Sequence, residues 1–96
     1  MRGFDATLGG YAWLPRMIDK ARAQEAGTLG DLEHPCPIDA TLLRLLGLDV
    51  ATFDAVVARE PTDAGVLDAL AALGVPAPEE ARFDPQALED ELRAEG

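Results

Sequence analysis

The sequence is poor in cysteine and histidine, and this shortage excludes two classes of small protein. It contains one cysteine, Cys36, and one histidine, His34. A lone cysteine cannot form an internal disulfide, so a disulfide-stabilised extracellular domain is excluded. The two side chains together also fall short of the three or four protein ligands that a zinc ion needs. We therefore expect a cytoplasmic protein with no bound metal and no other cofactor.

Long apolar stretches are also absent. No segment approaches the roughly 18 consecutive apolar residues that cross a bilayer. Met1 is followed by Arg2, Gly3, Phe4 and Asp5, which is not the apolar core of a signal peptide. We expect a protein that is neither secreted nor embedded in a membrane.

Positive charge is scarce as well. The 8 lysine and arginine residues stand against 18 aspartate and glutamate residues, which gives a net charge of −10. Such a charge opposes adhesion to nucleic acid and to anionic membranes. The stretch from Leu42 to Val57 superficially resembles a helix-turn-helix, but its second helix carries Asp54 and no base-reading cation before Arg59. We expect neither nucleic acid nor a membrane as a partner.

The residues that are abundant favour helices. Hydrophobic residues make up 48% of the sequence, and alanine and leucine far outnumber valine and isoleucine. Alanine and leucine lose little side-chain freedom in a helix, whereas β-branched residues lose more. A chain of 96 residues is too short for two independent cores. We therefore expect residues 1–96 to form a single helical domain.

Apolar residues at helical spacing, with proline or capping residues at the starts, predict five helices. They are expected at 15–25, at 37–46, after an Asp49 cap, after a Thr62 cap and after an Asp84 cap. Segment 26–37 is a loop rich in glycine and proline, and 75–83 is a linker to an acidic last helix with a narrow apolar stripe. We predict an all-α fold, a compact four- or five-helix bundle with short loops and the helix at 15–25 at its centre.

Two aromatic residues precede the first predicted helix. Gly9 and Gly10 indicate a loop or a close backbone contact, and a short segment carrying Tyr11 and Trp13 follows. Both side chains combine an aromatic face with a polar edge, so they are able to stack on a flat ligand. The alternative is a place in the core, which we favour for Trp13 and leave open for Tyr11.

A cluster of charged residues lies on the first predicted helix. Arg16 and Lys20 are like charges four positions apart, a spacing that costs roughly 0.2–0.5 kcal/mol in an isolated helix. An acidic group is therefore expected nearby. One interpretation is an anion site, in which Arg16 offers a planar two-bond contact and Lys20 a point charge to a carboxylate or a phosphate. Residues 1–30 hold four basic and three acidic groups, so this helix is the one locally basic part of the sequence.

The other interpretation, which we favour, is that the protein supplies its own acidic partners. Asp19 is expected to pair with Arg16 or Arg22 on the same helix. Carboxylates of other helices are expected to pair across the fold, and the candidates are Asp39, Asp49 and Asp63. Such internal ion pairs are common and mostly weak.

Cys36 lies between two prolines and is a candidate for chemistry. Its thiol could react as a nucleophile with His34 as the base, or the two could share a metal ion. The spacing matches no known site, and a buried thiol that packs as a small hydrophobe is the more frequent case. We favour the packing role.

Four short blocks of the sequence resemble one protein family. They are LGGYAWLPRMIDKARA at 8–23, GTLG at 27–30, CPID at 36–39 and LLGLD at 45–49. Together they resemble a bacterial family, the domain of unknown function number 5069. The resemblance extends from about Leu8 to Leu70, without the segment after Gly74, and His34 lies outside its pattern. It implies a helical fold and no particular activity.

These observations favour a noncatalytic binding or interaction module. Its working surface would include Arg16, Lys20 and Arg22, and its partner would be an acidic protein or a second copy of the chain. The alternative is a small enzyme or metabolite-binding protein that holds an anionic ligand through Arg16 and Lys20, with Cys36 or Asp19 as nucleophile or base. A pocket in which Asp39 converges with these residues would favour the alternative.

Overall fold

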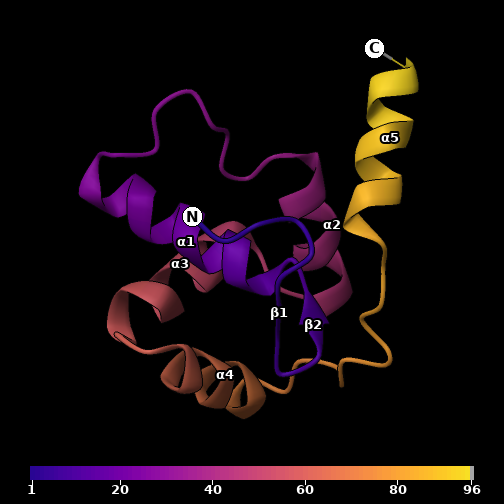
Figure 1. The fold of residues 1–96 in the computed structure, drawn as a ribbon. Coiled ribbons are helices and arrows are strands. Elements are labelled where there is room, and N and C mark those ends of the chain that lie inside the picture. The colour runs from indigo at the N-terminus through magenta and orange to yellow at the C-terminus, as the bar shows by residue number, and fades with distance from the viewer. Residues whose placement is uncertain (96) are drawn as a thin grey trace.

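The computed structural model describes residues 1–95, and most of them lie in helices (Figure 1). Its elements are β1 (Thr7–Leu8), β2 (Tyr11–Ala12), α1 (Leu14–Ala26), α2 (Pro37–Leu46), α3 (Val50–Arg59), α4 (Asp63–Ala72) and α5 (Pro85–Glu95). The five predicted helices are confirmed in the described residues. None of these helices is long and apolar enough to cross a membrane.

The helices begin where local capping residues place them. The side chain of Asp49 accepts a hydrogen bond from the Thr52 backbone N–H at the start of α3. Thr62 caps α4 in the same way through the Gly65 N–H. Each bond satisfies a backbone donor that has no partner within the helix, which is why caps fix helix starts so reliably.

A two-stranded hairpin before α1 corrects the all-α prediction. Leu8 pairs with Tyr11 in an antiparallel register, and Gly9 and Gly10 form the turn with φ angles of 58° and 87°. Glycine adopts these angles without strain, and a Gly-Gly pair between strand-forming residues is a hairpin signal. A Cβ at Gly9 would lie 2.9 Å from the Leu67 side chain, so the expected close backbone contact is present.

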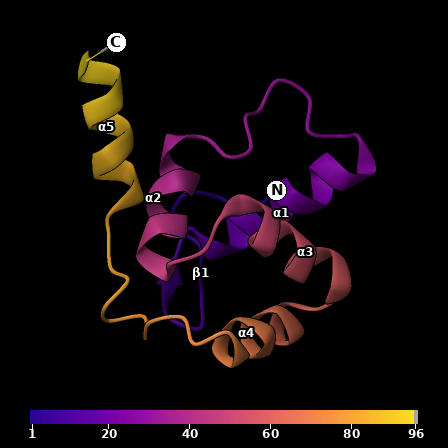
Figure 2. The same ribbon diagram turned by 180° about the vertical axis from the view of Figure 1, so that it is seen from behind.

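The core gathers around α1, which packs against α3 and β1, while α3 also contacts α2 and α4. Its largest fully buried apolar side chains are Trp13, Phe53, Leu14, Met17, Ile18, Leu42 and Leu70. The connections are not uniformly short, because 27–36 and 73–84 are long irregular segments. Helix α5 lies beside α2, at the edge of the molecule (Figures 1 and 2). The arrangement is therefore mostly helical and less regular than a short-looped bundle.

Candidate functional site

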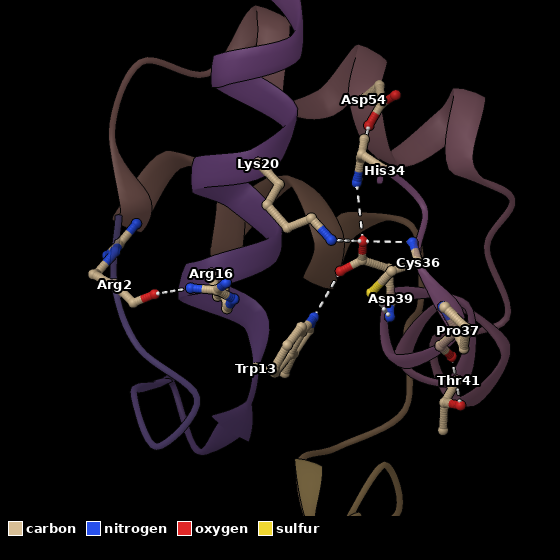
Figure 3. Close-up of polar contacts among 10 residues, drawn as sticks. All are labelled: Arg2, Trp13, Arg16, Lys20, His34, Cys36, Pro37, Asp39, Thr41 and Asp54. Carbon is tan, nitrogen blue, oxygen red and sulfur yellow. Dashed lines mark hydrogen bonds and ion pairs between the residues drawn. The ribbon is translucent and has the colours of Figure 1, made fainter. Parts of the chain in front are cut away.

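Asp39 is the centre of a buried polar cluster. It occupies the third position of α2, and its side chain is fully buried. Its Oδ1 accepts a hydrogen bond of 2.6 Å from the Trp13 indole N–H, and its Oδ2 accepts one of 2.5 Å from the Lys20 ammonium. The Cys36 backbone N–H and Nδ1 of His34 lie 3.0 Å and 3.3 Å from Oδ2 (Figure 3). We call these five residues the Asp39 cluster.

Lys20 does not belong to a basic surface, which corrects the expectation from the sequence. Only 3% of Lys20 is exposed, and its ammonium forms a buried ion pair with Asp39. The reason is its position on α1: Lys20 lies three residues after Met17 and seven after Trp13, so all three share one side of the helix. The expected pairing of Asp39 across helices is confirmed.

His34 joins the long loop between α1 and α2 to two helices. Its side chain is fully buried, and its Nε2 lies 2.7 Å from Oδ1 of Asp54 on α3. Its other ring nitrogen faces Asp39 on α2. The ring therefore bridges two carboxylates, a role that the sequence analysis missed because the path of the loop decides it.

The charges in the cluster stabilise one another. Burial by itself raises the pKa of Asp39, but hydrogen bonds from His34, Lys20, Trp13 and the Cys36 N–H outweigh it and hold that pKa well below its usual range. The hydrogen bond with Asp39 raises the pKa of His34, burial opposes the change, and Asp54 raises it further. The net result lies above the ordinary value of 6.5, which favours the imidazolium form.

Cys36 acts as the N-cap of α2. Its Sγ accepts a bond of 3.4 Å from the Asp39 N–H, while the Asp39 carboxylate accepts one from the Cys36 N–H. This reciprocal arrangement is a capping box, with a thiol in the place of the usual hydroxyl. Cys36 is partly buried and packs against the hydrophobic core, so the expected packing is present although the residue is not fully buried. Among residues 1–95, no group of three or more His, Cys, Asp or Glu is arranged to hold a metal ion.

A second polar group surrounds Arg2, which the sequence analysis did not identify. The guanidinium of Arg2 donates hydrogen bonds to both oxygens of Asp19 and to both oxygens of Asp63. Asp19 therefore pairs with Arg2, and the expected pair with Arg16 or Arg22 is not formed. Burial raises the pKa of Asp19, but the bonds from Arg2 outweigh it and lower the net pKa.

The two arginines of α1, Arg16 and Arg22, are bound more loosely than Arg2. Arg16 donates one hydrogen bond to the Arg2 carbonyl and lies over the Phe4 and Trp13 rings, 5.1 Å and 5.5 Å from their centroids. Figure 3 shows Arg16 turned toward Arg2 and away from Asp39. Arg22 lies 3.7 Å from an oxygen of Asp63, which was one of the three candidate cross-helix partners.

An open hollow lies next to these arginines. It measures about 810 Å³ and is lined by Met1, Arg2, Asp19, Arg22, Ala23 and Thr28. We call it the arginine hollow. It brings together two of the predicted site residues, Asp19 and Arg22, and Arg16 reaches its border through the Arg2 carbonyl. Lys20, Cys36 and Asp39 do not line it, so it is not the converging pocket that would favour the enzyme alternative.

Tyr11 and Trp13 both belong to the core. Trp13 is 2% exposed, and the Tyr11 hydroxyl donates a hydrogen bond of 2.6 Å to the Pro76 carbonyl. Burial raises the pKa of Tyr11, and the nearby Glu79 and Glu80 add to the effect. Neither ring presents an open face to a ligand. The core role favoured for Trp13 is confirmed.

The fold and these groups define a small, mostly helical protein with an ionic cluster closed inside it and arginines around an open hollow. Residues 1–88 match the family described as Domain of unknown function (DUF5069), and the chain belongs to that family. The matched region extends beyond the predicted 8–70 and takes in the linker and the start of α5. The comparison with curated proteins gives no match.

Proposed function

We propose that the protein is a noncatalytic binding module whose binding surface is the arginine hollow with Arg16 at its border. The observation that carries this proposal is the unequal pairing of the three arginines. Arg2 is saturated by two carboxylates, whereas Arg16 and Arg22 donate no hydrogen bond to a carboxylate among the described residues. Arg2 thus has a structural role, and Arg16 and Arg22 are the two arginines that would bind a ligand.

The chemistry of these arginines selects an anionic group. A guanidinium is planar, remains charged at any physiological pH and binds a carboxylate through two parallel hydrogen bonds. The guanidinium groups of Arg2, Arg16 and Arg22 outnumber the two nearby carboxylates, which are those of Asp19 and Asp63. The occupant we propose is an acidic segment of a protein partner. A second copy of this chain also qualifies, because the sequence after residue 30 is strongly acidic.

The closed Asp39 cluster favours binding over catalysis. Lys20 and Asp39 are 3% and 0% exposed, so a ligand would have to open the core to reach them. The rival hypothesis of a small enzyme needs Lys20 as a ligand-holding cation, and this lysine already has a partner. A small anionic metabolite remains the second candidate, because a hollow of about 810 Å³ lies within the size range of small-molecule sites.

A labelled hexaglutamate peptide tests the proposal by fluorescence anisotropy at low ionic strength. The double variant Arg16→Gln/Arg22→Gln keeps part of each stem and removes both charges. The matched control, Arg44→Gln/Arg82→Gln, has the same net charge and changes two exposed arginines outside the hollow. We expect about tenfold weaker binding in the first variant, or about 1.4 kcal/mol for two charged contacts, and little change in the control.

Two further measurements distinguish between the candidate ligands of the arginine hollow. Sedimentation of the wild type and of both variants reports self-association, which the hollow variant alone should lose if a second copy binds there. Thermal shift with citrate and pyrophosphate reports a small anion, which should stabilise the wild type and not Arg16→Gln/Arg22→Gln. If peptide, self-association and small anions are all insensitive to the hollow variant, the proposed surface is wrong.

We also infer a cytosolic location. The lone cysteine is a free thiol in the capping position of α2, a state that a reducing compartment preserves. Cell fractionation of the tagged protein checks this inference, and recovery in a secreted or membrane fraction would contradict it.

A further inference from the structure

A second hollow lies where the start of α5 meets the N-terminal segment. It measures about 400 Å³ and is lined by Phe4, Asp5 and Ala12 on one side and by residues 83–86 on the other. The linker between α4 and α5 brings these distant parts of the sequence together. We call this the phenylalanine hollow. It shares no lining residue with the arginine hollow.

The walls of the phenylalanine hollow are apolar. The rings of Phe4 and Phe83 and the smaller side chains of Ala12 and Pro85 line it. The Phe4 ring makes an edge-on contact with the buried Trp13 ring, with the ring centroids 4.7 Å apart. The aromatic and apolar side chains of this wall form a surface against which an apolar ring packs favourably.

The carboxylates of Asp5 and Asp84 complete the lining. Asp84 caps α5 with one oxygen, Oδ1, which accepts hydrogen bonds from the Gln86 and Ala87 N–H groups. Neither Asp84 nor Asp5 forms an ion pair among residues 1–95. Asp19, which lines the arginine hollow, is by contrast held by Arg2. The two hollows therefore have opposite electrostatic preferences.

We propose that the phenylalanine hollow binds a small arylalkyl ammonium ion, that is, an apolar ring that carries a protonated amine. The ring would pack against Phe83 and Pro85, and the amine would pair with Asp5 and the free oxygen of Asp84. The ring of Phe4 already lies under the Arg16 guanidinium, so the carboxylates rather than that ring select the cation. The volume of about 400 Å³ suits a molecule of this size.

Two-dimensional amide NMR with three probes tests this proposal. The probes are 2-phenylethylammonium, phenylacetate with the same ring and the opposite charge, and methylammonium with no ring. We expect 2-phenylethylammonium alone to shift the amides of Phe4, Asp5, Ala12 and Phe83 in a saturable manner. Equal shifts from phenylacetate or from methylammonium would overturn the proposal, as would the absence of saturable shifts.

Carboxylate variants with matched controls locate the site. Asp5→Asn/Asp84→Asn removes both charges, and asparagine at 84 preserves the cap of α5. Asp31→Asn/Asp49→Asn makes the same change of charge at an exposed loop and at the cap of α3. We expect about fivefold weaker amine binding in the first variant, the size of two partly exposed ion pairs, and no change in the second. Equal weakening in both, or shifts at these amides that follow protein concentration without the amine, would overturn the proposal.

Discussion

The indole N–H of Trp13 donates a hydrogen bond of 2.6 Å to Oδ1 of Asp39, which joins the residue before α1 to the first turn of α2. Trp13 has a left-handed backbone with φ at 72°. A residue with a Cβ pays about 1–3 kcal/mol for such a conformation. Burial of the indole and its bond to Asp39 offset that cost. The turn into α1 and the buried cluster therefore depend on each other.

Replacement of Trp13 by phenylalanine tests this dependence. The ring remains apolar, but the donor to Asp39 is lost, so we expect Trp13→Phe to lower the free energy of unfolding by about 1.5–3 kcal/mol. Urea denaturation followed by circular dichroism measures the change. Phe4→Leu is the control, because it removes the neighbouring ring and leaves the hydrogen bond in place. A cost for Trp13→Phe no larger than for Phe4→Leu would mean that the bond contributes little.

Disruption of the buried ion pair between Lys20 and Asp39 is expected to cost more stability. Asp39→Asn leaves the Lys20 ammonium buried without a counter-charge, and loss of one partner of such a pair typically costs about 3–5 kcal/mol. We expect a loss of this size in urea denaturation. Asp31→Asn, at an exposed position, should leave the stability unchanged. If Asp39→Asn is as stable as the wild type, the pair is not a main support of the fold.

Helix positions were predictable because the signals that fix them are local. The caps at Asp49 and Thr62 and the apolar spacing of α1 lie within a few residues of the features they determine. The repulsion between Arg16 and Lys20 also indicated correctly that an acidic partner lies nearby. The identity of that partner was less accessible, since the sequence placed Lys20 on one basic surface with Arg16 and Arg22, whereas its side chain is buried against Asp39 of α2.

The hairpin and the outer polar contacts could not be derived in the same way. Four paired residues carry little periodic signal, although the Gly-Gly pair at 9–10 was a usable one. Arg2 precedes every regular element, so nothing local relates it to Asp19 or Asp63. His34 meets Asp54 only because the long loop folds back over α2 and α3. Contacts made by irregular segments depend on the tertiary path of the chain.

The bridge made by His34 predicts a fall in stability on the alkaline side. Its pKa is raised in the folded state, so the folded protein binds its proton more tightly than the unfolded chain does. The resulting stabilisation is fully present below pH 6.5, the ordinary pKa, and is lost as the pH rises through the folded pKa. Asp39 does not titrate in this window, because its pKa is lowered.

Urea denaturation of the wild type and His34→Gln from pH 5.5 to 9 measures this effect. We expect the difference in unfolding free energy between the two proteins to be largest at the acidic end and to shrink as the pH rises. The upper limit keeps the tyrosine at position 11, whose pKa is also raised, in its neutral form. A difference that is constant or grows with pH would contradict a protonated bridge between Asp39 and Asp54.

Cys36 allows its capping and packing roles to be separated by two small substitutions. Serine keeps an acceptor for the Asp39 N–H and is a preferred N-cap, so we expect Cys36→Ser to equal or exceed the wild type in stability. Alanine removes the acceptor, and we expect Cys36→Ala to lose about 1 kcal/mol. A thiol that mattered as a small hydrophobe would give the reverse order, since alanine is the more apolar replacement. The order of the two urea midpoints therefore decides between the roles, whatever the absolute stability of the protein.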